Sequence, residues 1–577
     1  MLPSSQRALL TTYLRPEWRR TVLLGVLLLA GIGLQLANPQ IAKLFIDRAE
    51  AGEPLEQLVW IALLFIAVAL VTQVATVAET FVAEDLGWRT TNALRADLTR
   101  HVLELDAGFH AEHTPGELIE RIDGDVSAIA DFFARFVVQV LGNAVFLAGV
   151  LVLLYAEDWR IGALLSVCVL VVLAYLSRGG HFVAVRSRRA RQAAADVSAY
   201  LEERLGGLAD LKSSGADGYV LRGLQMRLAA RFASVGASVM AGSLFTSVVG
   251  LVLVIGTGAA LGLSTVLFAV GGMTLGSVYV VFRYTGMLRQ PLERLTRQMN
   301  RFQQAAGGIV RVSQLLATRR ELADGCGALP ADALSVELDM VSFAYSTEPV
   351  LRGVSARIEA GEVLGLLGRT GSGKTTVSRL LFRLHDPSRG AVRLGGVDLR
   401  QVELAKLRAR VGLVTQDVQL FQGTLRDNVA MFDRSIGDAC LRDVFEELGL
   451  HSWLAALPLG LDTVLGTGGR GLSAGEAQLV ALARVFLKSP GLVVLDEASS
   501  RLDPATELLL ERAVTRLLEG RTGVVIAHRL ATVQRADRIM ILDEGRVVES
   551  GRRCDLVGDP DSRFARLLRV GMSEVLA

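Results

Sequence analysis

The chain has 577 residues, which is too long for one compact domain, so two or more units are expected. Its 61 basic and 59 acidic side chains nearly cancel, so no global positive field points to a nucleic-acid partner. The four cysteines have neither metal-ligand spacing nor a paired pattern, which argues against a zinc site or a disulfide framework.

The N-terminal segment lacks the apolar core and cleavage site of a signal peptide. It instead predicts a helix lying along the cytosolic membrane surface, with Leu9, Leu10, Tyr13 and Leu14 on its apolar side. We therefore expect residues 1–20 to form a surface helix that precedes the membrane.

Long apolar runs dominate the first half of the chain, and a hydrocarbon core needs about 20 apolar residues per spanning helix. Six segments meet this requirement, at residues 21–45, 57–82, 132–155, 160–183, 238–266 and 274–297. The stretch GLSTVLFAVGGMTLGS between the last two predicts a tight external turn or further helix breaks. Residues 21–318 are therefore predicted to form a transmembrane domain embedded in the lipid bilayer.

The distribution of arginines indicates the orientation in the membrane. They gather before the first span and after the second and fourth, at Arg7, Arg15, Arg19, Arg20, Arg89, Arg95, Arg100, Arg186, Arg188, Arg189 and Arg191. Basic residues accumulate on the cytosolic side. The N-terminus and the C-terminal half are therefore expected in the cytoplasm, with the chain crossing the plasma (inner) membrane several times.

Two connections between spans, residues 83–131 and 184–237, are each about 50 residues long and have helical patterning. Connections of that length are seldom structureless. We interpret them as cytosolic extensions of the membrane helices, each broken by a short turn. Residues 319–334 then read as a linker to a soluble α/β domain over residues 335–577.

A glycine-rich loop lies between an apolar strand and a helix in VLGLLGRTGSGKTTVSRLL, which is the context of a P-loop. Backbone N–H groups of such a loop surround phosphates, while Lys374 reaches the β and γ oxygens and the Thr375 hydroxyl ligates Mg²⁺. The predicted ATP-binding residues of this loop are Gly368, Arg369, Thr370, Gly371, Ser372, Gly373, Lys374, Thr375 and Thr376.

Two carboxylates end the apolar strand in GLVVLDEASS, about 120 residues after the P-loop. Strands of a parallel sheet deliver their C-terminal ends to one edge, so both carboxylates are expected near the phosphates. Asp496 is placed to ligate Mg²⁺, and Glu497 to orient or deprotonate the attacking water.

Between these motifs, GRGLSAGEAQLVALARVFL resembles the signature segment of ABC transporter ATPases. The resemblance covers residues 335–577 densely, and the six-span pattern ahead of them is similar to the exporter branch of that family. It implies a half-transporter: an α-helical polytopic membrane domain followed by an α/β P-loop ATPase domain, whose ATPase activity drives transport as a translocase.

The resemblance implies roles for further residues. Tyr345 in VSFAYSTEPVL matches the aromatic residue that stacks on adenine, and Asp503 in SSRLDPAT matches a loop that crosses to the other subunit. Gln416 in LVTQDVQLF matches the glutamine that senses the γ-phosphate, contacts the membrane domain and joins the Mg²⁺ site. His528 in VVIAHRLATV matches the switch histidine that contacts the γ-phosphate.

The signature segment opens a helix at Ser473 and Gly475, whose N-terminal dipole favours an anion. In the family this helix faces the ATP of the opposite subunit, so two chains are needed to complete each site. The segment departs from the usual LSGGQ at Ala474 and Glu476, and Thr467 stands where such exporters usually have a glutamate. An altered signature beside an intact Glu497 favours a heterodimer with unequal ATP sites over a homodimer.

Arg283 falls near the middle of the sixth predicted span. A charge at that depth is costly, so it should face a watery cavity or a partner. The sequence leaves two roles open for Arg283, namely contact with an anionic or polar substrate and a structural ion pair. Gln35, Gln73, Gln139 and Asn143 either line the same cavity or bond across helices.

These features predict an ATP-hydrolysing exporter of a hydrophobic or amphipathic compound: a drug, a lipid or a small peptide. The alternative is an ATP-gated channel or a regulatory ABC subunit. Retention of Glu497 and His528 favours turnover over binding alone.

Overall fold

The computed structural model describes residues 12–13, 15–131, 138–469, 471–496, 503–526 and 533–570. Side chains are not described at 131, 138–139, 180–181, 293–306, 467 and 570. The chain divides into two compact units. Met1–Glu104 and His113–Arg319 form the first, called the helical unit, and Leu105–Glu112 and Arg320–Ala577 form the second, called the α/β unit.

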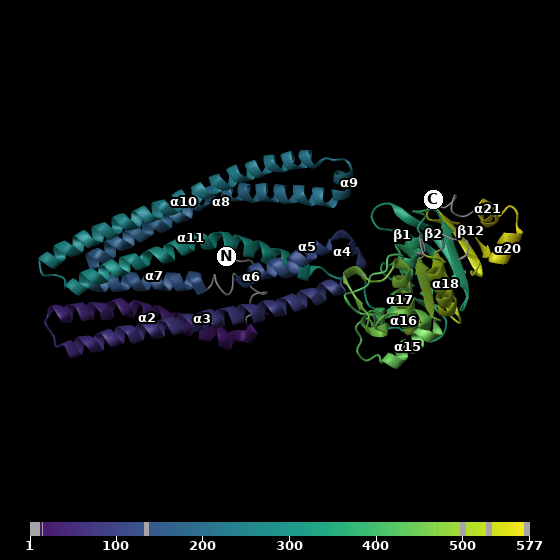
Figure 1. Ribbon diagram of the computed structural model, residues 1–577, viewed down its shortest axis with the longest axis horizontal. Coiled ribbons are helices and arrows are strands. Elements are labelled where there is room, and N and C mark those ends of the chain that lie inside the picture. The colour runs from purple at the N-terminus through teal and green to yellow at the C-terminus, as the bar shows by residue number, and fades with distance from the viewer. Residues whose placement is uncertain are drawn as a thin grey trace. The chain divides into compact units, whose positions relative to one another are not determined.

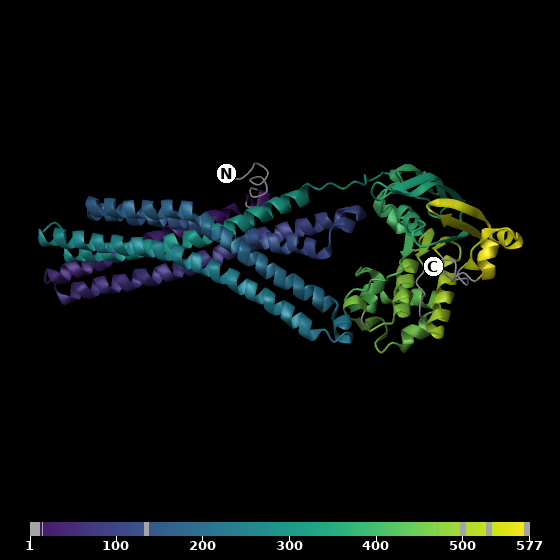
Figure 2. The same cartoon turned by 90° about the horizontal axis from the view of Figure 1, so that it is seen from above.

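Six long helices build the described part of the helical unit (Figure 1). They are α2 (Trp18–Glu50), α3 (Leu55–Glu104), α7 (Val138–Glu157), α8 (Trp159–Gly206), α10 (Asp217–Ala269) and α11 (Leu275–Ala317). α2 runs beside α3, and α8 beside α10, in both views (Figures 1 and 2). Each predicted span falls on one of these helices, although residues 132–137 lie outside the described residues.

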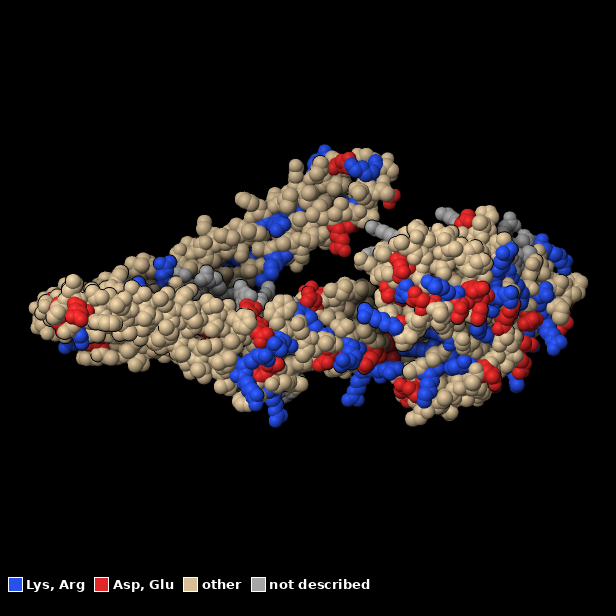
Figure 3. Space-filling model, turned by 60° about the horizontal axis from the view of Figure 1, so that its bottom comes forward, with Lys and Arg blue, Asp and Glu red and all other residues tan. Residues whose placement is uncertain are grey.

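Five of these helices have the length and composition to cross a membrane, counted over the described residues: α2, with the short turn before it, α3, α7, α8 and α10. α11, which carries Arg283 and Arg289, is not among them. Large apolar side chains are exposed along the outer faces, including Leu63, Phe65 and Leu70 of α3. Figure 3 shows long uncharged stretches over the helical unit, as expected for surfaces that contact lipid.

The long connections are helical, as expected for extensions of the spanning helices. After α3 come α4 (Ala107–Glu112), α5 (Pro115–Ile119), a π-helical turn (Glu120–Asp125) and α6 (Val126–Asp131). After α8 comes α9 (Leu208–Ser213), and α10 then begins at Asp217. Of the predicted N-terminal surface helix, residues 1–11 and 14 lie outside the described residues, and Arg15–Glu17 form a 3₁₀ turn before α2.

A tight turn, one of the two expected alternatives, separates the last two predicted spans. α10 continues through the apolar part of that stretch to Ala269, so only residues 270–274 leave the helix. Gly271 adopts φ +77°, which reverses the chain, and the Thr274 side chain caps α11 by accepting from the Ser277 N–H at 3.1 Å. Glycines inside an apolar run are tolerated in a helix, whereas the adjacent Gly271 and Gly272 end it.

A polar cluster joins α2, α7 and α11 within the helical unit. Glu157, whose side chain is 8% exposed, pairs with Lys43 at 2.7 Å and accepts from the Ser277 hydroxyl at 2.8 Å. Asp47 accepts from the Gly276 N–H at 2.9 Å. A Cβ on Gly276 would lie 2.7 Å from the Lys43 carbonyl, so the close approach requires glycine.

The α/β unit contains two main sheets and a short ribbon among its described residues. The larger sheet has the order β12-β11-β3-β10-β9-β6. Its strands are β3 (Val363–Gly368), β6 (Val411–Val414), β9 (Leu492–Asp496), β10 (Thr522–Ile526), β11 (Arg538–Asp543) and β12 (Arg546–Arg552). All neighbouring strands are parallel except β11 and β12. β3 and β10 are buried throughout, which explains their continuous apolar sequence.

The smaller, antiparallel sheet has the order β2-β1-β4-β5, and β7 pairs with β8 in the ribbon. These strands are β1 (Val336–Ala344), β2 (Pro349–Ile358), β4 (Arg389–Leu394), β5 (Val397–Asp398), β7 (Gly423–Thr424) and β8 (Val464–Leu465). The helices are α12 (Lys374–Leu381), α13 (Leu404–Arg410), α14 (Leu425–Ala430), α15 (Asp438–Glu447), α16 (His451–Ala456), α17 (Ala474–Leu487), α18 (Pro504–Leu518), α20 (Arg553–Gly558) and α21 (Arg563–Val570). One apolar core lies between the sheets, and a second packs α14–α18 against β6, β9 and β10.

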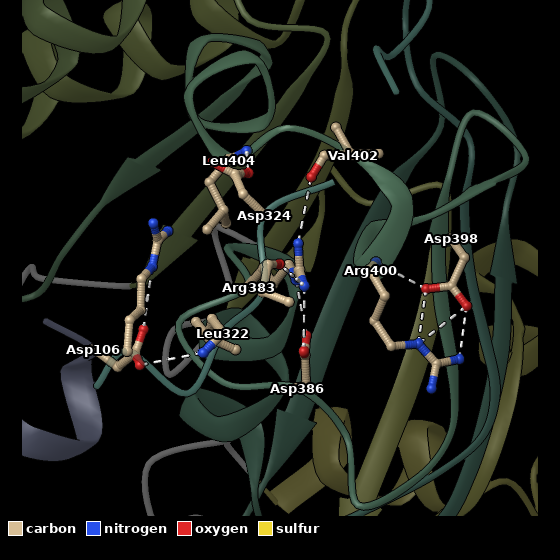
Figure 4. Close-up of polar contacts among 11 residues, drawn as sticks. Asp106, Leu322, Asp324, Arg383, Asp386, Asp398, Arg400, Val402 and Leu404 are labelled. Atoms are coloured by element: carbon tan, nitrogen blue, oxygen red, sulfur yellow. Dashed lines mark hydrogen bonds and ion pairs between the residues drawn. The ribbon is translucent and has the colours of Figure 1, made fainter. Parts of the chain in front are cut away.

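The turn around α4 and the chain after Arg320 are anchored inside the α/β unit (Figure 4). Asp106 accepts from the N–H groups of Glu321 and, at 3.2 Å, of Leu322. The Arg383 side chain is 2% exposed and donates to the carbonyl of Ala323 at 2.8 Å. Asp324 in turn accepts from the Leu404 N–H at 2.8 Å. The start of the α/β unit is thus fixed to its core.

Candidate functional site

The loop between β3 and α12 has the backbone of a phosphate-binding loop. Gly368, Gly371 and Gly373 adopt φ +149°, +83° and +105°, which L side chains rarely adopt. A Cβ on Gly368 would lie 2.2 Å from the Leu542 carbonyl, and one on Gly373 would lie 2.6 Å from Leu351. Side chains at these positions would therefore force the loop out of this shape.

Lys374 begins α12 and bends back over the loop. Its side chain is 6% exposed, and Nζ donates to the carbonyls of Gly368 at 2.6 Å and Arg369 at 2.9 Å. Burial lowers the pKa of Lys374 below its ordinary value, and the charge of Asp496 offsets part of that effect. The ammonium group is thus held where phosphate oxygens would complete its coordination.

Two further observations indicate that a nucleoside triphosphate fits the loop. The Ser372 hydroxyl is buried and makes no hydrogen bond to any described residue. Thr375 is exposed in the first turn of α12, at the positive end of the helix. A buried orphan donor, a left-handed glycine cradle and an exposed hydroxyl match the donors that phosphate and its metal ion require.

The other predicted catalytic residues follow parallel strands beside β3. β10 pairs with β3 on one side and with β9 on the other, and β9 pairs with β6. Asp496 ends β9, and Gln416 is exposed two residues after the end of β6. Glu497 follows β9 and His528 follows β10, and both lie outside the described residues. The sheet thus brings the P-loop, Asp496 and Gln416 to one edge.

Tyr345 lies just after β1, with its ring 47% exposed. Its hydroxyl lies 3.3 Å from the Thr376 hydroxyl and accepts from Arg379 at 3.1 Å. Phe343 and His385 meet the ring edge-on, with centroids 4.9 and 5.4 Å away. These contacts fix the ring beside the P-loop helix. Sequence reasoning missed Arg379 and His385, because neither belongs to a recognised motif.

The signature segment forms the start of α17, where Ser473 is the N-cap. Glu476 N–H donates to the Ser473 hydroxyl at 3.3 Å, and Ser473 N–H donates to the Glu476 carboxylate at 2.7 Å. The indole of Trp453 also donates to this carboxylate at 3.0 Å. Burial raises the pKa of Glu476, but these hydrogen bonds outweigh it, so the pKa lies below its ordinary value.

Glu476 stands where the usual signature has glutamine, and this reciprocal capping box gives it a structural role that the sequence alone did not reveal. Gly475 is buried in the first turn of the same helix. Asp503 caps α18 in a similar way, since its carboxylate accepts from the Thr506 N–H at 2.9 Å. That hydrogen bond lowers the pKa of Asp503.

A cavity of about 870 Å³ lies inside the helical unit, between α2, α3, α7 and α11. Arg283, Gln35 and Asn143 line it. Gln73 is not among the lining residues, and the Gln139 side chain lies outside the described residues. Glu79 also lines the cavity, although sequence reasoning did not single it out. A carboxylate within an apolar span was the signal that could have found it.

A bundle of long apolar helices followed by a P-loop α/β unit with a capped signature helix defines an ATP-driven membrane transporter. Two family models match the chain: the ABC transporter over residues 351–500, and the ABC transporter transmembrane region over residues 21–292. An ATP-dependent lipid A-core flippase of Chromobacterium violaceum is 30% identical over 576 residues, covering 97% of this chain and 96% of that protein. The chain belongs to the ABC transporter family.

Other similar proteins agree with this assignment. A multidrug efflux ATP-binding/permease protein of Mycobacterium tuberculosis is 32% identical over 566 residues, covering 96% of this chain and 46% of that protein. The structure of a bacterial Atm1-family ABC exporter with ATP bound matches with a TM-score of 0.81 and 26% identity, over 96% of this chain and 98% of that one. The chain is thus an exporter-type half-transporter that acts as a dimer. It couples ATP hydrolysis in a cytoplasmic domain to transport across the membrane.

Proposed function

We propose that this half-transporter exports a hydrophobic or amphipathic compound, namely a drug, a lipid or a small peptide. The cavity between α2, α3, α7 and α11 carries this proposal, because apolar and polar side chains share its wall. Pockets of several hundred Å³ with a few polar groups are typical of small-molecule sites. The names of the relatives, a lipid A-core flippase and a multidrug efflux protein, support an amphipathic substrate.

In the proposed ATPase site, Lys374 and the P-loop N–H groups hold the phosphates, and Tyr345 stacks on the adenine. Thr375, Asp496 and Gln416 hold Mg²⁺, which neutralises charge on the phosphate oxygens when bound. Glu497 accepts a proton from the attacking water, and His528 orients the reacting phosphoryl group. The shared sheet edge of β3, β9 and β6 supports these roles.

The proposed working unit is a heterodimer with two unequal ATP sites. Ser473 and Gly475 on the α17 end of this chain face the ATP bound by the partner, and Asp503 lies at the crossing between subunits. The Glu476 carboxylate accepts from the Ser473 N–H, and the Glu476 N–H donates to the Ser473 hydroxyl. The carboxylate also places a negative charge where phosphate would bind. Like charges repel, which supports a weakened composite site at this end of the chain.

The test is to purify this chain alone in nanodiscs and to measure ATP hydrolysis and nucleotide trapping with and without a Glu497→Gln substitution. We expect little steady hydrolysis until a second half-transporter with a standard signature is added. A stable homodimer of this chain that hydrolyses ATP and transports a compound would refute the heterodimer.

A channel or a regulatory subunit would share every ATP motif with an exporter. Retention of Glu497 favours turnover, since gating requires binding alone. Nucleotide-dependent uptake of a fluorescent amphiphile into sealed inverted vesicles, compared with ionic conductance in planar bilayers, separates the two functions. We expect uptake without conductance, and ATP-gated current in the absence of uptake would overturn the export function.

A further inference from the structure

The cavity in the helical unit has two kinds of wall. Its large apolar side chains come from α2, α7 and α11: Leu28, Ile32, Phe146, Phe282 and Met287. Its neutral polar side chains are Gln35, Thr76, Thr80, Asn143 and Gln290. A molecule with an apolar part and a polar head therefore matches the lining better than a purely apolar one.

Two opposite charges also face this cavity from different helices. Glu79 comes from α3 and Arg283 from α11. Within the part of the chain that the structure describes, neither side chain has an ion-pair partner, and they do not pair with each other. Glu84, a second carboxylate at the cavity, already interacts with another part of the chain.

Glu79 lies close to a glycine in the neighbouring helix. Gly31 of α2 is buried, and a Cβ there would lie 3.8 Å from Oε2 of Glu79. The carboxylate therefore lies against the backbone of α2 instead of pointing into lipid. A charged side chain in a spanning segment is costly unless a partner or water compensates it, and both charges here are open to a ligand.

We propose that the cavity binds a zwitterionic amphiphile, whose ammonium group pairs with Glu79 and whose acidic group, a carboxylate or phosphate, pairs with Arg283. A simple cation would leave Arg283 uncompensated, and a simple anion would leave Glu79 uncompensated. Only a ligand with both charges satisfies both side chains. This inference rests on the proposed export function and deepens it by naming the substrate class.

Three amphiphiles that share one dodecyl chain test the proposal: dodecylphosphocholine, dodecyltrimethylammonium and dodecyl phosphate. Binding is measured by titration calorimetry below micellar concentrations, with the nucleotide-free dimer in nanodiscs. The dimer contains this full chain and its partner half-transporter where one is required. We expect the zwitterion to bind roughly 10- to 100-fold more tightly than either singly charged compound, since hydrogen bonds to charged groups have that strength.

Single substitutions should remove the two halves of this preference separately. Glu79→Gln should reduce zwitterion affinity to that of dodecyl phosphate, and Arg283→Gln should reduce it to that of dodecyltrimethylammonium. Glu56→Gln is the matched control, because Glu56 is exposed at the start of α3, outside the cavity lining. It should leave all three affinities unchanged. The exchanged pair Glu79→Arg with Arg283→Glu keeps both charges in the cavity and should regain zwitterion binding, which guards against misfolding of a single variant.

Equal affinity for the three compounds in the unsubstituted protein would overturn the zwitterion proposal, as would loss of the preference in the Glu56 control. The export function is judged separately by ATP-dependent uptake into vesicles. Uptake of an unrelated amphiphile without a zwitterion preference would refute only the substrate class. Absence of ATP-dependent uptake for every compound would refute the export function.

Discussion

The nucleotide edge of the α/β unit and the cavity of the helical unit are built in different ways. The P-loop contributes nine consecutive residues, from Gly368 to Thr376, to the proposed ATP site, and left-handed glycines hold its shape. The cavity is lined by three to six residues from each of four helices, and these residues lie up to about 260 positions apart in the sequence. One substitution in the P-loop should therefore abolish ATP hydrolysis. One substitution in the cavity should instead change only which ligands it prefers.

The largest expected effect tests the local half of this comparison. Lys374→Met should abolish ATP hydrolysis and ATP-driven transport, because the ammonium held over the P-loop is lost while the aliphatic packing is retained. Phosphate release and vesicle uptake measure it. Membrane insertion and elution as a dimer should be unchanged, since Lys374 lies outside the helical unit. Residual hydrolysis near the unsubstituted rate would show that the loop is not the catalytic site.

A smaller loss is expected at the carboxylate beyond β9. Glu497→Gln preserves size and hydrogen bonding but removes the proposed base, so hydrolysis should fall by roughly 10² to 10⁴ while ATP binding persists. Trapped nucleotide after rapid gel filtration, together with phosphate release, checks both halves of this expectation. Glu519→Gln is the comparison variant, because this carboxylate is exposed at the end of α18 and has no proposed role in the ATP site. An equal fall in both variants would contradict the assignment of Glu497.

The contribution of Tyr345 should be smaller again. Tyr345→Ala removes the ring proposed to stack on adenine and should weaken ATP binding roughly tenfold or more, from the usual strength of base stacking. Tyr345→Phe keeps the ring and loses only the hydroxyl contacts with Thr376 and Arg379, so ATP affinity should change by about threefold or less. Calorimetric titration with ATP measures both. Similar losses in the two variants would assign the effect to the hydroxyl instead of the ring.

The two regions also differ in how far the sequence predicts them. The strand, glycine loop and helix around Lys374 are contiguous, so both the fold and the chemistry follow from local spacing. The six long helices follow from apolar length, because a bilayer imposes one length on every span. The cavity could be predicted only in part. Arg283 is conspicuous as a charge in an apolar run, but Glu79 becomes a lining residue only through the packing of α3 against α2, beside Gly31.

Local contacts explain further differences between expectation and structure. The anchoring of Asp106 to the backbone of Leu322 joins segments more than 200 residues apart, and no spacing rule predicts it. Two alternatives were expected after α10, a tight turn or further helix breaks. The structure has the tight turn, because the intervening apolar residues continue the helix to Ala269. Tertiary packing decides such cases, since a weak local signal is compatible with several backbones.

The smallest expected effect concerns the signature helix. Glu476 caps this helix in its own chain and is also proposed to influence the ATP bound by the partner. Glu476→Gln should keep the capping box, since the glutamine oxygen can accept from the Ser473 N–H. It should lose the Trp453 contact, because Ser473 and Trp453 donate to different oxygens of the carboxylate and glutamine has only one acceptor oxygen. It removes one negative charge from the α17 N-terminus. The protein should lose about 1 to 2 kcal/mol of stability, from the interaction of an acidic side chain with a helix dipole and from the lost indole hydrogen bond. ATP bound at the composite site should in turn be held a few-fold more tightly, since a charge repulsion of about 1 kcal/mol near a protein surface is removed. Nucleotide trapping by the assembled dimer and thermal unfolding measure the two effects.

Glu446→Gln on the exposed face of α15 is the matched control, and it should change neither nucleotide trapping nor stability. Lower stability without tighter nucleotide binding would mean that the carboxylate serves only as a cap, and the argument for unequal ATP sites would lose its structural support.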